Sequence, residues 1–241
     1  MTDATPTRKS DLGVRTLSAI VMLAVAGAAL WLGGYAWTAF VLAVAAVVLF
    51  EWRSLVRGFT LHWRGRILWN LGGILYIGLA AAMLLLLREG PGMVEVGAEL
   101  VLLIALPVIA TDIGAYFTGR AIGGPKIAAR ISPSKTWAGL FGGMIAAGLA
   151  MTVSARLLGD ARLLGDGSVA AGYLPGYFLA GAAIAVIAQA GDFFESWMKR
   201  KAGVKDSSHL IPGHGGLLDR VDGLMAVCFV LGLCYVAMKL A

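Results

Sequence analysis

Long runs of apolar residues, nearly free of charge, recur along the whole 241-residue chain. Each run approaches the roughly 20 residues that a helix needs to cross about 30 Å of hydrocarbon. The runs are continuous in Leu, Ala, Val, Ile and Gly, whereas a membrane β-barrel would show short alternating strands. Charged residues make up only 14% of the chain, against about a quarter in soluble domains. The sequence therefore predicts an all-α, polytopic transmembrane helical bundle.

The pattern predicts about seven spans, in a range of six to nine, because some runs are short and closely spaced. Gly33 and Gly34 join the first two spans, which form either a tight hairpin or one long broken segment. The predicted spans cover residues 16–33, 35–52, 67–87, 98–117, 138–157, 173–192 and 223–240.

Basic residues gather on one side of this predicted topology. With a cytoplasmic N-terminus, the inside segments hold most of the 20 Lys and Arg residues, as the positive-inside rule requires. The formal charge of +6 then reflects topology and attraction to anionic membrane lipids, and no nucleic acid partner is needed. We expect an integral membrane protein whose basic loops face the cytoplasm.

The chain divides into three predicted parts. Residues 1–15 are polar and are expected to form a disordered cytoplasmic tail. Residues 16–97 form an N-terminal transmembrane region, and residues 98–241 form a catalytic transmembrane region. Since no long soluble domain separates the spans, the chemistry is expected at the span ends and in two cytoplasmic loops, at residues 118–137 and 193–222.

Asp112 lies inside a long apolar run. Ionisable groups are costly in the bilayer and are functional candidates by default, so we expect Asp112 to face the bundle interior. The alternative is a structural role, in which Asp112 only pairs with another helix.

The segment Ile131–Trp137 brings hydroxyls, a lysine and a proline together just before an apolar span. Such a segment can direct backbone N–H groups, Ser132, Ser134 and Lys135 at phosphate oxygens. Helix capping explains the hydroxyls equally well, so the segment alone leaves both interpretations open.

The densest polar cluster extends from Gly191 to Asp222. On a helix its first acidic and basic residues share one face, and two more carboxylates follow at the start of the last span. Carboxylate oxygens suit Mg²⁺, which bridges substrate phosphates, and cations beside glycines suit phosphoryl or nucleotidyl transfer. The alternative is a solvated loop without a catalytic role. The residues concerned are Asp192, Glu195, Ser196, Lys199, Arg200, Lys205, His214, Gly215, Gly216, Asp219, Arg220 and Asp222.

These motifs resemble the phosphatidate cytidylyltransferase family. The family's C-terminal pattern is filled at every fixed position by Ser196, Lys199-Arg200, Lys205-Asp206, Pro212-Gly213-His214-Gly215-Gly216 and Asp219-Arg220-Val221-Asp222. Asp112–Tyr116, Ser132–Trp137 and Gln189–Asp192 are also similar to the family, so the resemblance covers roughly residues 105 to 225. Ala138 departs from it, because relatives often carry an acidic or amide residue there.

The resemblance implies transfer of the cytidylyl group of CTP to phosphatidic acid, giving CDP-diacylglycerol and pyrophosphate in phospholipid biosynthesis. It implies a Mg²⁺-dependent inner-membrane enzyme whose partners are CTP, phosphatidic acid and membrane lipids, and for which a homodimer is possible. On this basis we assign metal binding to Asp112, Asp192, Asp219 and Asp222. We assign catalytic roles to Lys199, Lys205, His214, Asp219 and Asp222, and substrate binding to Ser132, Ser134, Lys135, Ser196, Arg200, Gly215, Gly216 and Arg220.

Other classes of membrane protein share part of this pattern. A transporter also places acidic residues inside spans, but it does not explain a long polar loop rich in phosphate-type ligands. A lipid-alcohol kinase that uses CTP would release CDP, and a CDP-alcohol phosphotransferase would release CMP. Release of pyrophosphate distinguishes the favoured reaction from both.

Overall fold

Seven helices make up nearly all of the part of the chain that the structure describes. The computed structural model describes residues 12–89, 97–159 and 173–241, and within these ranges the chain is helical apart from connecting loops and two isolated β-bridges. All seven helices are long and apolar enough to cross a membrane, so the prediction of a helical bundle with about seven spans is confirmed. They are α1 Leu12–Leu32, α2 Gly34–Phe59, α3 Trp63–Glu89, α4 Gly97–Ala121, α5 Trp137–Gly159, α6 Leu174–Lys201 and α7 Leu218–Leu240.

Several helices extend beyond the predicted spans. Helix α1 begins at Leu12, so the predicted tail is helical from there on, and its residues 1–11 lie outside the described residues. Helix α6 continues to Lys201 and α7 begins at Leu218, which shortens the predicted loop 193–222 to residues 202–217. Hydropathy locates the apolar part of a helix, whereas charged residues continue the same helix wherever they pair along it.

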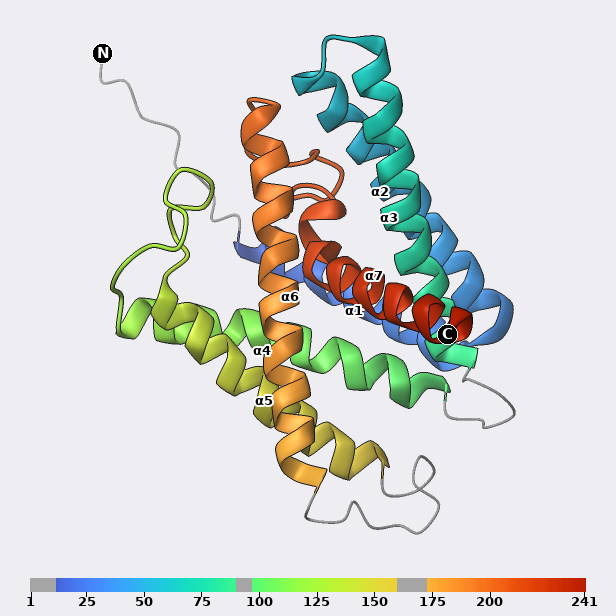
Figure 1. The fold of residues 1–241 in the computed structure, drawn as a ribbon, viewed down its shortest axis with the longest axis vertical. Coiled ribbons are helices and arrows are strands. Elements are labelled where there is room, and N and C mark those ends of the chain that lie inside the picture. The colour runs from blue at the N-terminus through green and yellow to red at the C-terminus, as the bar shows by residue number, and fades with distance from the viewer. Residues whose placement is uncertain (1–11, 90–96, 160–172) are drawn as a thin grey trace, which may run out of the picture.

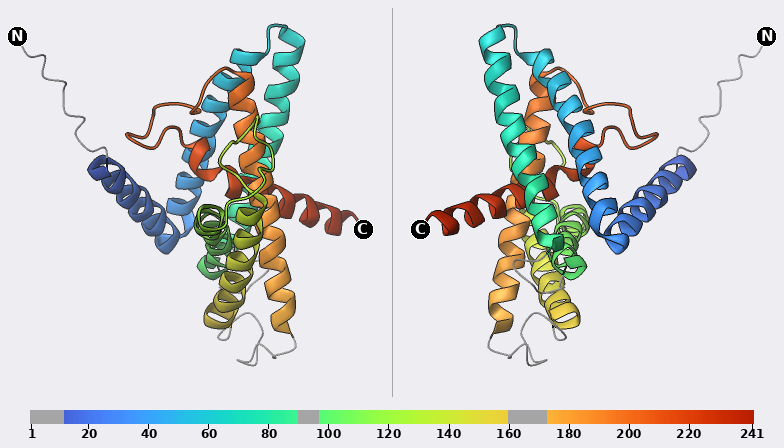
Figure 2. Two further views of the ribbon diagram at one scale, coloured as in Figure 1. Left: turned by 90° about the vertical axis from the view of Figure 1, so that its left-hand side faces the viewer. Right: turned by 90° about the vertical axis from the view of Figure 1, so that its right-hand side faces the viewer.

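A single glycine separates the first two helices. Gly33 has φ 64° and Gly34 has φ 47°, a left-handed conformation that glycine adopts without a steric penalty. The chain therefore reverses direction, and α1 and α2 form a hairpin instead of one broken segment. Figure 2 shows that α1 diverges from the rest of the bundle as it leaves this turn.

The tightest helix pair is α4 and α5, which lie side by side in Figure 1. Small residues allow this approach: a Cβ at Gly142 of α5 would collide with Thr118 of α4, and Gly143 lies against Thr111. Helix α6 crosses α5 and extends beyond it to the region where α2 and α3 lie (Figure 1). Helix α6 therefore links the two halves of the bundle.

Two apolar clusters form the core. One gathers side chains from α1 to α7, among them Trp37, Ile104 and Val227. The other lies where α2, α3, α6 and α7 meet, and includes Trp52 and Met198. Two glutamates, Glu51 and Glu195, are buried beside this second cluster at 1% and 3% exposure. Buried carboxylates need compensating partners, so this junction is where a site is expected.

Candidate active site

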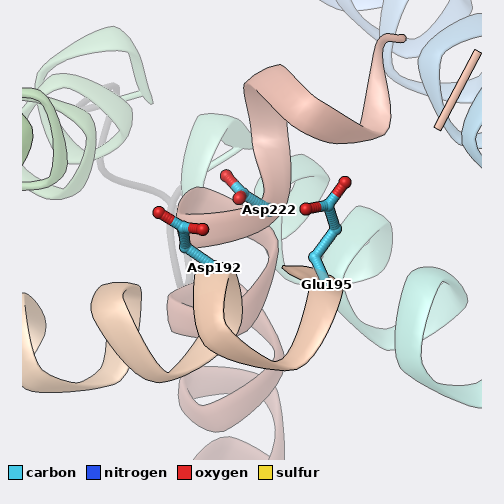
Figure 3. A group of neighbouring side chains, drawn as sticks. All are labelled: Asp192, Glu195 and Asp222. Atoms are coloured by element: carbon cyan, nitrogen blue, oxygen red, sulfur yellow. The ribbon is translucent and has the colours of Figure 1, made fainter. Parts of the chain in front are cut away.

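Three carboxylates converge where α6 meets α7. Asp192 and Glu195 come from α6 and Asp222 from α7 (Figure 3), and one oxygen of each lies within 4.8 Å of the others. The helices approach closely because Gly191 has no side chain: a Cβ there would lie 2.5 Å from that of Ala226. The predicted convergence of carboxylates from two helix ends therefore involves these three residues, which we call the carboxylate triad.

Two lysines partly balance the negative charge of the triad. Lys135 reaches it from the loop between α4 and α5, where it forms an ion pair with Asp192 and lies 4.9 Å from the ring centroid of Phe193. Lys199 of α6 lies 2.6 Å from Glu195. The Ser196 hydroxyl donates to Asp192 at 3.2 Å. Three acids thus face two cations, which leaves excess negative charge available to a cationic ligand.

Glu195 is the triad member best suited to a metal ion. Among the described residues, its buried Oε1 has no hydrogen-bond partner. A buried polar atom without a partner is costly, and a divalent cation would satisfy it. The donor set of carboxylate oxygens is the one that Mg²⁺ prefers. The residues present therefore fit a magnesium ion.

Asp219 accepts hydrogen bonds from the loop that precedes α7. Its Oδ1 accepts from Lys199 at 2.5 Å, and its Oδ2 accepts from the backbone N–H and hydroxyl of Ser207 and from the N–H of Gly216, at 2.8–2.9 Å. These bonds tie the loop of residues 202–217 to the start of α7. Asp219 also lies within hydrogen-bonding range of the Glu195 side chain, so it borders the triad, and its predicted role as a metal ligand remains a prediction.

Lys199 connects the two acidic centres. Its Nζ lies 2.6 Å from Glu195 and 2.5 Å from Asp219, and its side chain is only 12% exposed. A buried lysine between two carboxylates fixes their separation as well as their charge. Lys199 therefore couples the order of the loop to the position of the triad.

Glu51 of α2 holds the first turn of α7, a contact that the sequence analysis missed. Its two carboxylate oxygens accept from the Leu217 N–H at 2.9 Å, the Leu218 N–H at 2.7 Å and the hydroxyls of Ser207 and Ser208 at 3.2 and 2.5 Å. A carboxylate is favoured at a helix N-terminus, where N–H groups are unpaired. An acidic residue within an apolar run, the signal used for Asp112, also applies to Glu51.

The glycine-rich part of the loop is a tight turn. Gly213 and Gly215 have φ 75° and 81°, and the Ile211 N–H donates to Gly215 O at 2.9 Å. Gly216 is buried, and a Cβ there would collide with Ser207 and crowd Glu51. Gly216 therefore permits close approach of protein groups, while the predicted contacts of Gly215 and Gly216 with substrate remain predictions.

His214 faces α1. Its Nδ1 shares a hydrogen bond of 2.8 Å with the hydroxyl of Ser18, which also donates to Pro212 O at 3.2 Å. Gly213 lies against Arg15 of the same helix. The first turns of α1 thus contact the glycine-rich turn, although most of α1 diverges from the bundle. These contacts give His214 a structural role in holding α1 to the glycine-rich turn, and its catalytic role stays a prediction.

The remaining predicted substrate ligands do not join the triad, and their roles stay predictions. Ser132 is buried, while Ser134, Arg200, Lys205 and Arg220 are exposed. The hydroxyl that caps α5 belongs to Thr136, whose Oγ1 accepts from the Gly139 N–H at 3.1 Å. Helix capping therefore explains one hydroxyl of the Ile131–Trp137 segment, and Lys135 is the member that reaches the carboxylates.

Asp112 borders the carboxylate triad. The residue is accessible at the surface of helix α4, and its carboxyl lies within electrostatic range of Lys135, Asp192 and Arg220. The carboxyl is therefore near the triad without being one of its members. The expectation that Asp112 faces the bundle interior stays a prediction.

An all-helical membrane protein with acids and lysines clustered at its helix ends has the kind of site that phosphoryl- and nucleotidyl-transfer enzymes use. Comparison with known proteins narrows this class. Residues 68–238 match the sequence profile described as the cytidylyltransferase family. The chain belongs to this family.

Several relatives carry a more specific name. The phosphatidate cytidylyltransferase of Brucella suis biovar 1 is 34% identical over 265 residues, covering 93% of each chain. The protein of the same name from Rickettsia bellii is 32% identical, over 93% of this chain and 90% of the relative. The one from Haemophilus influenzae is 44% identical, over 54% of this chain and 43% of the relative. The resemblance inferred from the motifs is confirmed, and it extends over nearly the whole chain.

Proposed function

We propose that this protein transfers the cytidylyl group of CTP to phosphatidic acid, forming CDP-diacylglycerol and pyrophosphate. The observation that carries the proposal is the convergence of Asp192, Glu195 and Asp222 with Lys135 and Lys199. A negatively charged oxygen site flanked by lysines suits a metal-bound nucleotide and a phosphate. The names of the relatives supply the identity of the two substrates.

In the proposed reaction, a phosphate oxygen of phosphatidic acid attacks the α-phosphorus of CTP. The bond from that phosphorus to the oxygen bridging the β-phosphorus breaks, and pyrophosphate leaves with the bond electrons. No covalent enzyme intermediate is needed, because the attacking phosphate is itself the nucleophile. The main tasks of the protein are then to hold two anions in line and to offset their charge.

The carboxylate triad would hold Mg²⁺, and Asp112 and Asp219 remain further ligands predicted from the sequence. When bound, the ion neutralises charge on the phosphates. Lys135, held beside Asp192, would turn its N–H donors to a phosphate oxygen. Lys199 keeps Glu195 and Asp219 in place. The exposed cations Arg200, Lys205 and Arg220 would attract CTP and lipid head groups.

Phosphatidic acid lies in the membrane leaflet, whereas CTP is dissolved in water. A site at the ends of membrane-spanning helices lets the two meet without removing the lipid from the bilayer. The basic loops support a location at the cytoplasmic face of a bacterial inner membrane. Self-association into a homodimer is part of the same proposal.

The test uses purified protein in detergent with phosphatidic acid, Mg²⁺ and CTP labelled separately at the α- and γ-phosphates. The proposal predicts α-label in the lipid product and γ-label in pyrophosphate. Label from the γ-phosphate in lipid would instead indicate a lipid kinase. In a parallel assay with a CDP-alcohol in place of CTP, release of CMP would indicate a phosphotransferase. No label in lipid with either CTP would contradict an enzymatic role in this reaction.

A further inference from the structure

An apolar groove lies against α2, α3 and α6, close to the carboxylate triad. It has a volume of about 280 Å³ and is lined by Trp52, Leu68, Trp69, Gly72, Tyr76 and Phe194. The groove opens to the surface, since Leu68 on its rim is 70% exposed. All of these residues belong to helices that are long and apolar enough to cross a membrane.

A second, much smaller cavity lies between the groove and the triad. It is lined by Glu195 and Asp222, and by Trp52, Tyr76 and Phe194, which also line the groove. Three aromatic side chains thus have one side toward the groove and the other toward the carboxylates. A molecule with an anionic end beside the triad and an apolar end in the groove would contact both surfaces at once.

The walls of the groove are held in place before any ligand binds. The Trp52 indole N–H donates to Trp69 O at 3.0 Å, and its ring lies 6.0 Å from that of Tyr76 and 5.9 Å from that of Phe194. Gly73 fixes this packing from behind, because a Cβ there would collide with the Trp52 ring. A groove with fixed walls can position a chain as well as bind it.

Gly72 leaves the groove open. A Cβ added at this position would meet no atom within 4 Å, so the backbone itself forms this part of the lining. Any larger side chain at position 72 would extend into the space of the groove. By contrast, Gly73, the next residue, is packed against Trp52.

We propose that this groove holds an acyl chain of the phosphatidic acid substrate while its phosphate lies at Lys135, beside the carboxylate triad. The inference rests on the proposed function and adds a subsite to it. Lipid chains are as apolar as the groove, so entry into it brings little hydrophobic gain, and the chain is held by packing contacts with the aromatic walls. The substrate's own chain is the favoured occupant because its head group is bound next to the groove, which raises its local concentration there.

The proposal predicts that filling the groove impairs use of long-chain substrate alone. In Gly72→Leu the new side chain occupies the groove, and the KM for dioleoyl phosphatidic acid is expected to rise about fivefold through lost packing contacts. The KM for CTP, and kcat/KM for dihexanoyl phosphatidic acid, whose short chains do not reach along the groove, should stay within about twofold. Gly78→Leu is the matched control, since Gly78 lies on the same helix, a Cβ there also meets no atom within 4 Å, and it does not line the groove.

The outcomes separate this proposal from the proposed function. If the unchanged protein makes no CDP-diacylglycerol from either lipid, the proposed function is wrong and the groove proposal goes with it. If the unchanged protein is active, then equal behaviour of Gly72→Leu and Gly78→Leu, or equal loss with long and short chains, overturns the groove proposal alone. If Gly72→Leu does not insert into the membrane, Gly72→Ala provides a second test, because it adds only one carbon in open space. We expect Gly72→Ala to raise the KM for the long-chain lipid by a smaller factor.

Discussion

Glu51 and Glu195 are both buried glutamates, but their carboxylates have different surroundings. Glu51 accepts four hydrogen bonds from the loop and from the first turn of α7. Glu195 is paired with Lys199, while its Oε1 has no partner among the described residues. A satisfied carboxylate stabilises the fold, whereas an unsatisfied one is available to a ligand. The two residues therefore lead to opposite predictions.

Replacing Glu195 with glutamine should abolish activity without loss of fold. Glutamine keeps the size of the side chain but removes the negative charge that a divalent cation would meet, so we expect about a 100-fold lower rate of CDP-diacylglycerol formation. The protein should still fold, with a modestly lower thermal midpoint in detergent, because Lys199 loses one partner but keeps Asp219. The control is Glu99→Gln in the first turn of α4. Full activity of Glu195→Gln at low Mg²⁺ would contradict the metal assignment.

Replacing Glu51 with alanine should mainly lower stability. Four donors lose their acceptor, two of them at the start of α7, at a cost of about 3 kcal/mol in the free energy of unfolding. We expect a clearly lower thermal midpoint in detergent, with activity lost in parallel because the loop is no longer held. An unchanged midpoint together with full activity would show that Glu51 does not cap α7.

The contact between α6 and α7 determines the shape of the site at the scale of elements. Gly191 lies against Ala226 and the Asp222 backbone, and Gly223 lies against Ala188. Small residues on both helices allow their backbones to approach closely. The distance between the two helices in turn sets the distance between Asp222 and the two carboxylates of α6.

Replacing Gly191 with valine should separate these helices and impair the site. A side chain at this position meets backbone as well as the Ala226 Cβ, so the helices must shift, and we expect activity to fall more than tenfold because misplacement of about 1 Å is costly in catalysis. Gly176→Val on the same helix is the control, since a Cβ there meets no atom within 4 Å. Equal activity of the two variants would contradict the importance of this contact.

The sequence predicted the spans and part of the site for identifiable reasons. Length and hydropathy were sufficient to find seven spans, but not the end of α6 at Lys201, because its polar last turns are held by side-chain pairing. Spacing placed Asp192 and Asp222 at approaching helix ends. It did not reveal that Ser207 and Gly216 donate hydrogen bonds to the Asp219 carboxylate, or that Glu51 contacts the start of α7. These contacts depend on how the loop of residues 202–217 folds. The sequence also did not show that Glu195 belongs to the triad, because this depends on how α6 and α7 cross.

At the scale of the whole molecule, the polar residues come from distant parts of the chain. Lys135 arrives from the loop between α4 and α5, Glu51 from α2, and α1 contacts the glycine-rich turn through Ser18. Helix α1 otherwise diverges from the bundle (Figure 2). All of these contacts lie on one side of the seven-helix arrangement, the side that the positive-inside rule predicts to be cytoplasmic.

This orientation can be measured with single cysteines. In a variant without Cys228 and Cys234, Lys205→Cys should react with a membrane-impermeant maleimide only in inside-out vesicles. Tyr35→Cys, at the turn between α1 and α2 where Tyr35 is 95% exposed, should react only in intact spheroplasts. The reverse pattern would place the N-terminus and the loops outside, and reaction of both residues from one side would contradict the arrangement of spans.

The position of Glu51 has a consequence for how the protein is made. Its hydrogen-bond donors lie 156 to 167 residues further along the chain, so α2 leaves the ribosome long before they exist. An unpaired charge inside a span costs about 3 kcal/mol. The Glu51 carboxylate therefore lacks its hydrogen-bond partners until α7 is made. Helix α7 thus completes the membrane assembly of α2, which is synthesised long before it.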